Sequence, residues 1–443
     1  MELEEVELLP NGLVTCFINN EELRILKLSP RSITLRMLEE VSEIFSFRLE
    51  FYNFDRDTYE EVEITKFQIN NFLKSKFYTE GKFYIDDDEY RNLVRRITKD
   101  YLNYIRLKTE GIDNEFSMEM VGYKAEKDYD FYESYSKQKK DLLKNIKNLD
   151  FFCDKFSLAV KLDNYTLYNE YLKRDIESFS KWYFENNYLE EHFLSKKNIS
   201  RLYIGNEFCH NLFPNLELLK KLLMKACKEK LDITLAFTYL REEFIEKTKT
   251  IIEEVYLFCK ENKIKIEIVV NDWGIIKLFD MKNEYFDFNL GILLNKRKKD
   301  PRMVYKNLSD NKRELFEINN LNSQFFIDYL GSLNINRFEF ESVGYKIKLP
   351  IGSHSLQLPF YQTNTSQYCT LYASCNNYYR GNQSLVNNCP IYCNRYAFLY
   401  PKHLSLFGIY NSLFGFDKNI LIDNDLFNYY INNGIDRIVL NFM

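Results

Sequence analysis

Several features that would restrict this chain to a special class of protein are scarce or missing. Only eight Pro and 14 Gly occur among 443 residues, which argues against a collagen-like or low-complexity chain. The first residues, MELEEVELLP, lack the basic and apolar regions of a secretory signal. The apolar runs, such as residues 264–270, are far too short to span a bilayer. We therefore expect a cytoplasmic protein that does not enter a membrane.

Familiar catalytic motifs are also missing. The chain contains no G-x-S-x-G, H-E-x-x-H, P-loop or G-x-G-x-x-G motif. A serine hydrolase, a zinc peptidase of the H-E-x-x-H type, a P-loop nucleotidase and an ordinary dinucleotide oxidoreductase are therefore not indicated. The chain has 60 basic and 65 acidic residues, a net charge of −5, which argues against general DNA binding.

Apolar residues, in contrast, are plentiful enough for more than one core. They make up 45% of the chain, and its length suggests two or three domains. Six segments between residues 12 and 87 alternate apolar and polar side chains, which predicts short antiparallel strands. Residues 88–109 place apolar side chains four residues apart, as in an amphipathic helix. We expect residues 1–112 to form a small antiparallel β-barrel plus this helix, and 113–154 a helical linker.

From residue 155 onward, strand and helix patterns alternate. Apolar strands such as 201–205 and 335–341 are interleaved with amphipathic helices, including a long one over about 167–185. Such alternation is typical of parallel strands joined by crossover helices. The length of the region favours a closed barrel over an open sheet. The fold class predicted for residues 155–443 is thus α/β, a parallel (β/α)8-type (TIM-like) barrel.

The most distinctive feature of the sequence is a group of cysteines near the C-terminal end. Cys369, Cys375, Cys389 and Cys393 lie within 25 residues, and Cys209 directly follows a predicted barrel strand. Four thiolates are what a 4Fe-4S cluster or a structural zinc ion requires. Zinc is the weaker alternative, because the paired C-x2-C knuckles of zinc ribbons are missing. The other cysteines are expected to be ordinary core residues: Cys16, Cys153, Cys227 and Cys259.

Four segments of the predicted barrel resemble a known family. They are RLYIGNEFC (201–209), IEIVVNDWGIIKLF (266–279), LGILLNKRKKDPR (290–302) and QYC…CPIYC (367–393). They are similar to the collagenase-like peptidase family, peptidase family U thirty-two, in patches over residues 155–443. The likeness is greatest to its iron–sulfur branch, which serves oxygen-independent hydroxylation of ubiquinone and of RNA bases.

The resemblance implies a ligand set and a reaction class. Cys209, Cys389 and Cys393 match the family's cysteine positions, and the fourth ligand is Cys369 or Cys375. Cys369 is preferred because it occupies the place of the family's first downstream cysteine. The family often has an Arg just before that cysteine, whereas residues 365–368 here are TSQY. The implied substrate is a small molecule, a peptide or an RNA base, and a homologous barrel is the implied partner.

Other polar residues follow predicted strands and each has two interpretations. Asp272 is either an acid at the barrel mouth or the N-cap of the next helix. Arg297 and Arg302, in the basic run 295–302, either hold an anionic substrate or belong to a solvated loop. His210 is a hydrogen-bond donor near the cluster, a general acid or base, or a structural histidine.

The N-terminal region and the overall function leave further alternatives. Residues 26–40 and 45–54 resemble a PilZ-like domain, but the loop KLSPRS (27–32) lacks the acid and the Gly of the cyclic-di-GMP motif. We expect a docking or substrate-presenting module there. For the whole protein we expect an iron–sulfur enzyme. The alternatives are a peptidase-like hydrolase, or a non-catalytic assembly or binding protein with a structural cluster or zinc.

Overall fold

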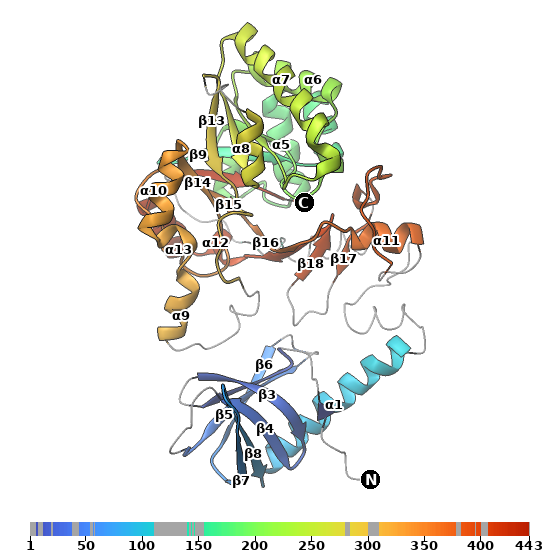
Figure 1. The fold of residues 1–443 in the computed structure, drawn as a ribbon, viewed down its shortest axis with the longest axis vertical. Helices are drawn as coiled ribbons and strands as arrows, with labels where there is room; N and C mark the ends of the chain where they lie inside the picture. Colours follow the sequence, from blue (N-terminus) through green and yellow to red (C-terminus); the bar gives the residue numbers. More distant parts are fainter. Residues whose placement is uncertain are drawn as a thin grey trace. The chain divides into compact units, whose positions relative to one another are not determined.

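The computed structural model divides into two compact units, which are described separately below. One contains the N-terminal strands and the first long helix, and the other contains the barrel (Figure 1). The structure describes residues 6–7, 12–18, 21–37, 44–53, 56, 58–109, 140, 143, 146, 155–279, 284–299, 310–377, 382–394, 396–399 and 406–442. The predicted linker 113–154 thus lies almost entirely outside the described residues.

The N-terminal unit is an antiparallel sheet of eight strands that forms a half-barrel (Figure 1). Its main path runs in the order β6-β5-β2-β3-β4-β8-β7, and β1 pairs with β3. The strands are β1 (Val6–Glu7), β2 (Val14–Ile18), β3 (Glu21–Ser29), β4 (Ser32–Met37), β5 (Phe47–Asn53), β6 (Thr58–Ile64), β7 (Phe67–Lys74) and β8 (Thr79–Ile85). The expectation of six strands missed β1 and β7. β7 lies at the edge, where Ile69 and Leu73 are exposed, so its apolar pattern does not mark one buried face.

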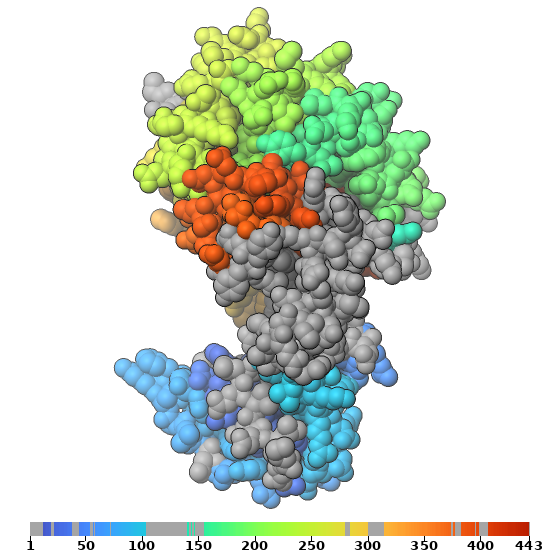
Figure 2. Space-filling model, turned by 90° about the vertical axis from the view of Figure 1, so that its right-hand side faces the viewer, coloured from blue at the N-terminus to red at the C-terminus, as the bar shows by residue number. Residues whose placement is uncertain are grey.

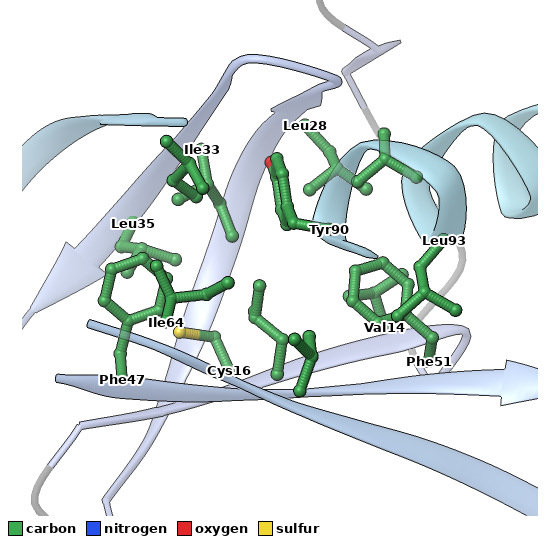
Figure 3. Packing of buried hydrophobic residues seen from close by; sticks show 14 of the residues in the cluster. Val14, Cys16, Leu28, Ile33, Leu35, Phe47, Phe51, Ile64, Tyr90 and Leu93 are labelled. Atoms are coloured by element: carbon green, nitrogen blue, oxygen red, sulfur yellow. The ribbon is translucent and has the colours of Figure 1, made fainter. Parts of the chain in front are cut away.

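The predicted helix is α1 (Asp88–Thr109), and its first turns close the core of this unit. Asp87 caps the start of the helix by accepting a 2.8 Å hydrogen bond from the backbone N–H of Tyr90. Tyr90 and Leu93 point from the helix into the apolar cluster of the sheet (Figure 3). The Tyr90 hydroxyl donates to the carbonyl oxygens of Ser29 and Ser32, at 2.8 and 3.0 Å. This polar anchor ties the helix to the β3–β4 turn.

The second unit contains a closed barrel of eight parallel strands, as the sequence predicted. The order around the barrel is β10-β11-β12-β13-β14-β15-β20-β9. The strands are β9 (Ser157–Leu162), β10 (Ile199–Gly205), β11 (Asp232–Ala236), β12 (Ile266–Val270), β13 (Phe286–Leu290), β14 (Ile335–Glu341), β15 (His354–Leu358) and β20 (Ile435–Leu440). Because all eight are parallel, the loops after them gather at one end of the barrel.

Helices connect most of these strands. The helices are α4 (Tyr165–Lys173), α5 (Ile176–Asn186), α6 (Leu216–Lys228), α7 (Ile245–Asn262), α8 (Trp273–Phe279), α9 (Asp310–Glu317), α10 (Gln324–Ser332), α12 (Asn419–Ile422) and α13 (Asn424–Asn432). The single helix expected over 167–185 is two helices, because Asp175 caps α5 through the Ser178 N–H at 2.8 Å. Among the described residues, no helix is both long and apolar enough to cross a bilayer.

The structure adds an antiparallel sheet that the sequence did not predict. It lies between β15 and β20 in the chain, in the order β16-β19-β18-β17. Its strands are β16 (Phe360–Thr365), β17 (Phe398–Leu399), β18 (Leu406–Ile409) and β19 (Ser412–Phe416), and the helix α11 (Thr370–Asn377) follows β16. This insertion carries the C-terminal cysteines.

Candidate metal centre and adjoining pocket

The cysteines singled out in the sequence come from two places at the same end of the barrel. Cys209 lies four residues after β10, and the others follow β15 within the insertion. Cys369 directly precedes α11, and Cys393 lies in a single 3-10 turn, Tyr392–Asn394. In Figure 2 the orange surface of the insertion lies against the green and yellow-green surface of the first half of the barrel.

The thiols of four of these cysteines are neighbours. Burial raises the pKa of Cys209 to about 12, and the thiols of Cys369 and Cys389 raise it further. Burial also raises the pKa of Cys393 well above its usual range, and Cys209, Cys369 and Cys389 add to that increase. Cys375 is buried and acts on the thiol of Cys369, whose pKa burial raises to about 11. The thiols of Cys209, Cys369, Cys389 and Cys393 thus interact with one another, and Cys375 interacts at least with Cys369.

Backbone N–H groups point at the sulfurs of these cysteines. Tyr372 donates to Cys369 Sγ, and Ile391 donates to Cys389 Sγ, both at 3.3 Å. The backbone amides of Asn211 and Leu212 hydrogen-bond to Cys209 and lower the pKa of its thiol, against the larger effect of burial. Such donors stabilise a thiolate and tune the potential of iron–sulfur clusters. Burial nevertheless raises the pKa of Cys209, Cys369 and Cys393, and the Cys369 thiol donates to the carbonyl oxygen of Tyr410 at 3.3 Å.

The thiols are not packed as the ligands of a single ion. Within the described residues, no three or more His, Cys, Asp or Glu side chains form a group that could hold one metal ion. Thiolates on one zinc ion stand about 3.8 Å apart, given Zn–S bonds of about 2.3 Å in a tetrahedron. Those on a cubane cluster stand about 6 to 7 Å apart. Four thiols are the residue types that a 4Fe-4S cluster takes as ligands.

The loop that carries Cys209 is held rigidly by its own side chains. The Asn206 Oδ1 atom accepts hydrogen bonds from the N–H groups of Phe208 and Cys209, both at 2.8 Å. Gly205 has a φ of +116°, and a Cβ there would lie 2.5 Å from the carbonyl oxygen of Ala236. Only glycine can make this turn, because both the backbone conformation and the close approach exclude a side chain.

A buried ion pair lies beneath this loop, near the carboxyl ends of the strands. Lys161 Nζ is 2.6 Å from Glu207 Oε1, and their side chains are 1% and 0% exposed. Gln357 donates to the same oxygen at 2.9 Å, and Asn271 donates to Glu207 Oε2 at 3.0 Å. Although burial alone would raise it, the pKa of Glu207 is lowered by Lys161 and these amides. Both oxygens of the Glu207 carboxylate therefore have hydrogen-bond partners.

A polar pocket of about 620 Å³ adjoins the cysteines at this end of the barrel. Tyr239 lines the pocket, and burial followed by the Cys209 thiol raises its pKa to about 12. The lining is mainly polar and includes Asn271, Asp272, Asn295, Lys296, Arg297, Lys299 and residues 362–367, together with the apolar Leu240 and 292–294. Tyr239 thus connects the pocket to the cysteine group.

Of the two residues expected to be catalytic, Asp272 has both oxygens hydrogen-bonded, whereas the buried Nε2 atom of His210 has no partner among the described residues. Asp272 lines the pocket, but its oxygens accept hydrogen bonds from the N–H groups of Gly274 at 2.7 Å and Leu240 at 3.2 Å. It therefore caps α8, the second of its two expected roles. His210 stacks on Phe244 with ring centroids 4.2 Å apart, and burial lowers its pKa to about 4. Its ring is therefore packed against an aromatic side chain.

The basic run folds back onto the barrel. The Arg297 side chain is 2% exposed, donates to the carbonyl oxygen of Glu341 and lies 3.9 Å from its carboxylate. Lys299 forms an ion pair with the same carboxylate. Sequence reasoning missed Lys299 and Glu341, although Lys299 lies in the basic run and Glu341 ends a predicted strand. Arg302 lies outside the described residues.

The cysteines expected to be core residues are placed as follows. Cys16 and Cys259 are buried, and Cys227 is half-buried. Cys153 belongs to the part of the chain that the structure does not describe.

Asn271 connects the cysteine loop to the pocket wall, and this contact yields a prediction. Its side-chain amide donates to Glu207, and its Oδ1 atom accepts a 3.0 Å hydrogen bond from the N–H of Leu293. A Cβ on Gly291 would lie 2.2 Å from that oxygen, so we expect Gly291→Ala to lower the free energy of unfolding by about 1–3 kcal/mol. Urea denaturation measures this loss. Gly331→Ala is the control, because nothing lies within 4 Å of a Cβ there. Equal stabilities of the two variants would contradict the contact.

Comparisons with known proteins add little to this geometry. No family model and no curated protein matches the chain. An uncharacterised Legionella protein of known structure shares 13% identity and a TM-score of 0.16, over 24% of this chain and 97% of that chain. The Bacillus subtilis inhibitor of motility (MotI/DgrA) shares 12% identity and a TM-score of 0.17, over 20% of this chain and 46% of that chain. At such TM-scores neither likeness carries a functional argument.

Proposed function

We propose that this protein is an iron–sulfur enzyme whose barrel holds a 4Fe-4S cluster through Cys209, Cys369, Cys389 and Cys393. The observation that carries the proposal is the gathering of these four thiols, from two distant segments, at the end of the barrel where active sites form. The resemblance of residues 201–209 and 367–393 to the iron–sulfur branch of the collagenase-like peptidases supports the same ligand set.

The pocket beside the thiols supports an enzyme rather than a purely structural cluster. The pocket wall is polar. Tyr239 is part of that wall, and it interacts with the thiols of Cys209 and Cys369. When bound, the cluster would supply redox or Lewis-acid chemistry. The chain's own residues bind and orient a substrate: the amides following β15 and the cations of residues 296–299 offer hydrogen bonds and charge.

The reaction class follows from the resemblance. We propose oxygen-independent hydroxylation, or a related modification, of a small molecule, a peptide or an RNA base. A peptidase mechanism has less support, because Asp272 and His210 have the surroundings of structural residues. The N-terminal half-barrel is proposed as a docking or substrate-presenting module, and a homologous barrel as partner.

Anaerobic purification tests the proposal directly. We expect a brown protein with broad absorption near about 400 nm and about four iron atoms per chain, because thiolate-to-iron charge transfer absorbs there. Absorption spectra and metal analysis of the same sample measure both quantities. A colourless protein that carries one zinc ion would overturn the iron–sulfur reading, since Zn²⁺ has a filled d shell.

A further inference from the structure

Two buried cations share one carboxylate at the wall of the pocket. The side chains of Arg297, Lys299 and Glu341 are only 2%, 9% and 2% exposed. In the described part of the chain, Glu341 supplies the only carboxylate within ion-pair distance of either cation. Among the described residues, the group therefore has two cations for one carboxylate. A second buried cation is costly unless a second anion compensates it.

In the pocket wall, the neutral amide of Gln362 occupies the position beside Lys299 where a second anion could bind. Lys299 Nζ donates to the Glu341 carboxylate, to the carbonyl oxygen of Gln362 at 2.6 Å, and to Gln362 Oε1 at 3.2 Å. The last contact is the longest, and it is made by a side chain that lines the pocket and whose amide also donates to Thr365 Oγ1 at 3.1 Å. An ammonium group has three donors, so an incoming anion must replace one of these acceptors.

We infer that the pocket binds a small anionic group, a phosphate or a carboxylate, which takes the place of the Gln362 amide against Lys299. The exposed Lys296 lines the same pocket and adds a cation at its rim. The one acid in the described lining, Asp272, has both oxygens held by backbone N–H groups. Burial lowers the pKa of Lys299, Glu341 opposes that effect, and Arg297 adds to it. The anion would be part of the substrate bound at the proposed active site, and its binding does not require the cluster.

The main test variant introduces a negative charge beside Lys299 from a protein side chain. Gln362→Glu places a carboxylate where the amide oxygen now meets Lys299, so it should raise the melting temperature and weaken phosphate binding about tenfold or more. Lys299→Met keeps the aliphatic stem and should also weaken binding about tenfold or more. Calorimetric titration with inorganic phosphate and, separately, with succinate measures these affinities and separates a phosphate site from a carboxylate site.

A matched control distinguishes this contact from a general charge effect. Gln367 lines the same pocket and is exposed, so Gln367→Glu adds the same charge away from Lys299 and should change the affinity less than about threefold. Equal effects of the two glutamates, or no binding of either anion by the unmodified protein, would overturn the inference. Iron content is measured on the same samples. If iron is missing while the anion results hold, the cluster proposal fails and this inference stands.

Discussion

Replacing any one of Cys209, Cys369, Cys389 and Cys393 with Ser is expected to abolish most of the bound iron. A cubane cluster needs a thiolate at each of four corners, and a serine hydroxyl is neither soft nor readily deprotonated. Each variant removes a thiol that interacts with the others at the barrel mouth. Iron and acid-labile sulfide, measured per chain after anaerobic purification, should fall from about four of each to well below half of that value.

Cys375→Ser is the matched control for these variants. It makes the same atomic change on α11, six residues from Cys369, and it should keep the iron and the absorption spectrum. The sequence alone left Cys369 and Cys375 as alternatives. The interactions of Cys209 and Cys393 with Cys369 favour that residue. Retention of iron in Cys369→Ser together with its loss in Cys375→Ser would reverse the assignment.

Lys161→Met is expected to lower the free energy of unfolding of the barrel by about 3–5 kcal/mol. The change leaves the Glu207 carboxylate without its cation in a site where that side chain is 0% exposed. The amides of Gln357 and Asn271 still donate to Glu207, but they do not supply charge. Urea denaturation of the apoprotein, followed by circular dichroism, measures the loss.

Two further variants show whether the loss comes from the buried charge. In the double variant Lys161→Met, Glu207→Gln the isolated charge is gone, so it should recover a large part of the stability lost by Lys161→Met alone. The exposed pair Lys221 and Glu217, 2.6 Å apart in α6, is the surface counterpart. Lys221→Met should cost only a small fraction of the buried effect, because water and salt screen that pair. Equal losses at the two sites would show that burial does not set the cost.

The helices and strands could be predicted where the local pattern has one explanation. The predicted helix 88–109 coincides with α1, because its apolar side chains recur at helical spacing and Asp87 caps it. The two-residue strand β1 and the edge strand β7 were missed, since such strands leave little or no buried alternation. The break between α4 and α5 was missed for a related reason. Asp175 starts a new helix there, but a single capping residue barely disturbs an apolar repeat.

Some features of the candidate site could likewise be predicted from the sequence, and others could not. Cysteine spacing, and a basic run after a strand, are visible in the sequence because the residue types themselves are unusual. The role of Asp272 was left open, since a carboxylate that caps a helix and one that faces a substrate look alike in a sequence. Its two backbone donors, one of them 32 residues away at Leu240, show the capping contact, and Asp272 also lines the pocket.

The sequence by itself therefore determined the two fold types, a strand-rich N-terminal unit and a parallel barrel, together with the group of cysteines near the C-terminal end. These depend on periodicity and residue type, which are local properties. Only the tertiary structure decided which charges meet: Lys161 with Glu207, and Arg297 with Lys299 on the single carboxylate of Glu341. The physical reason is that ion pairing depends on distance in space and on burial, and barrel closure brings together residues that the chain keeps far apart.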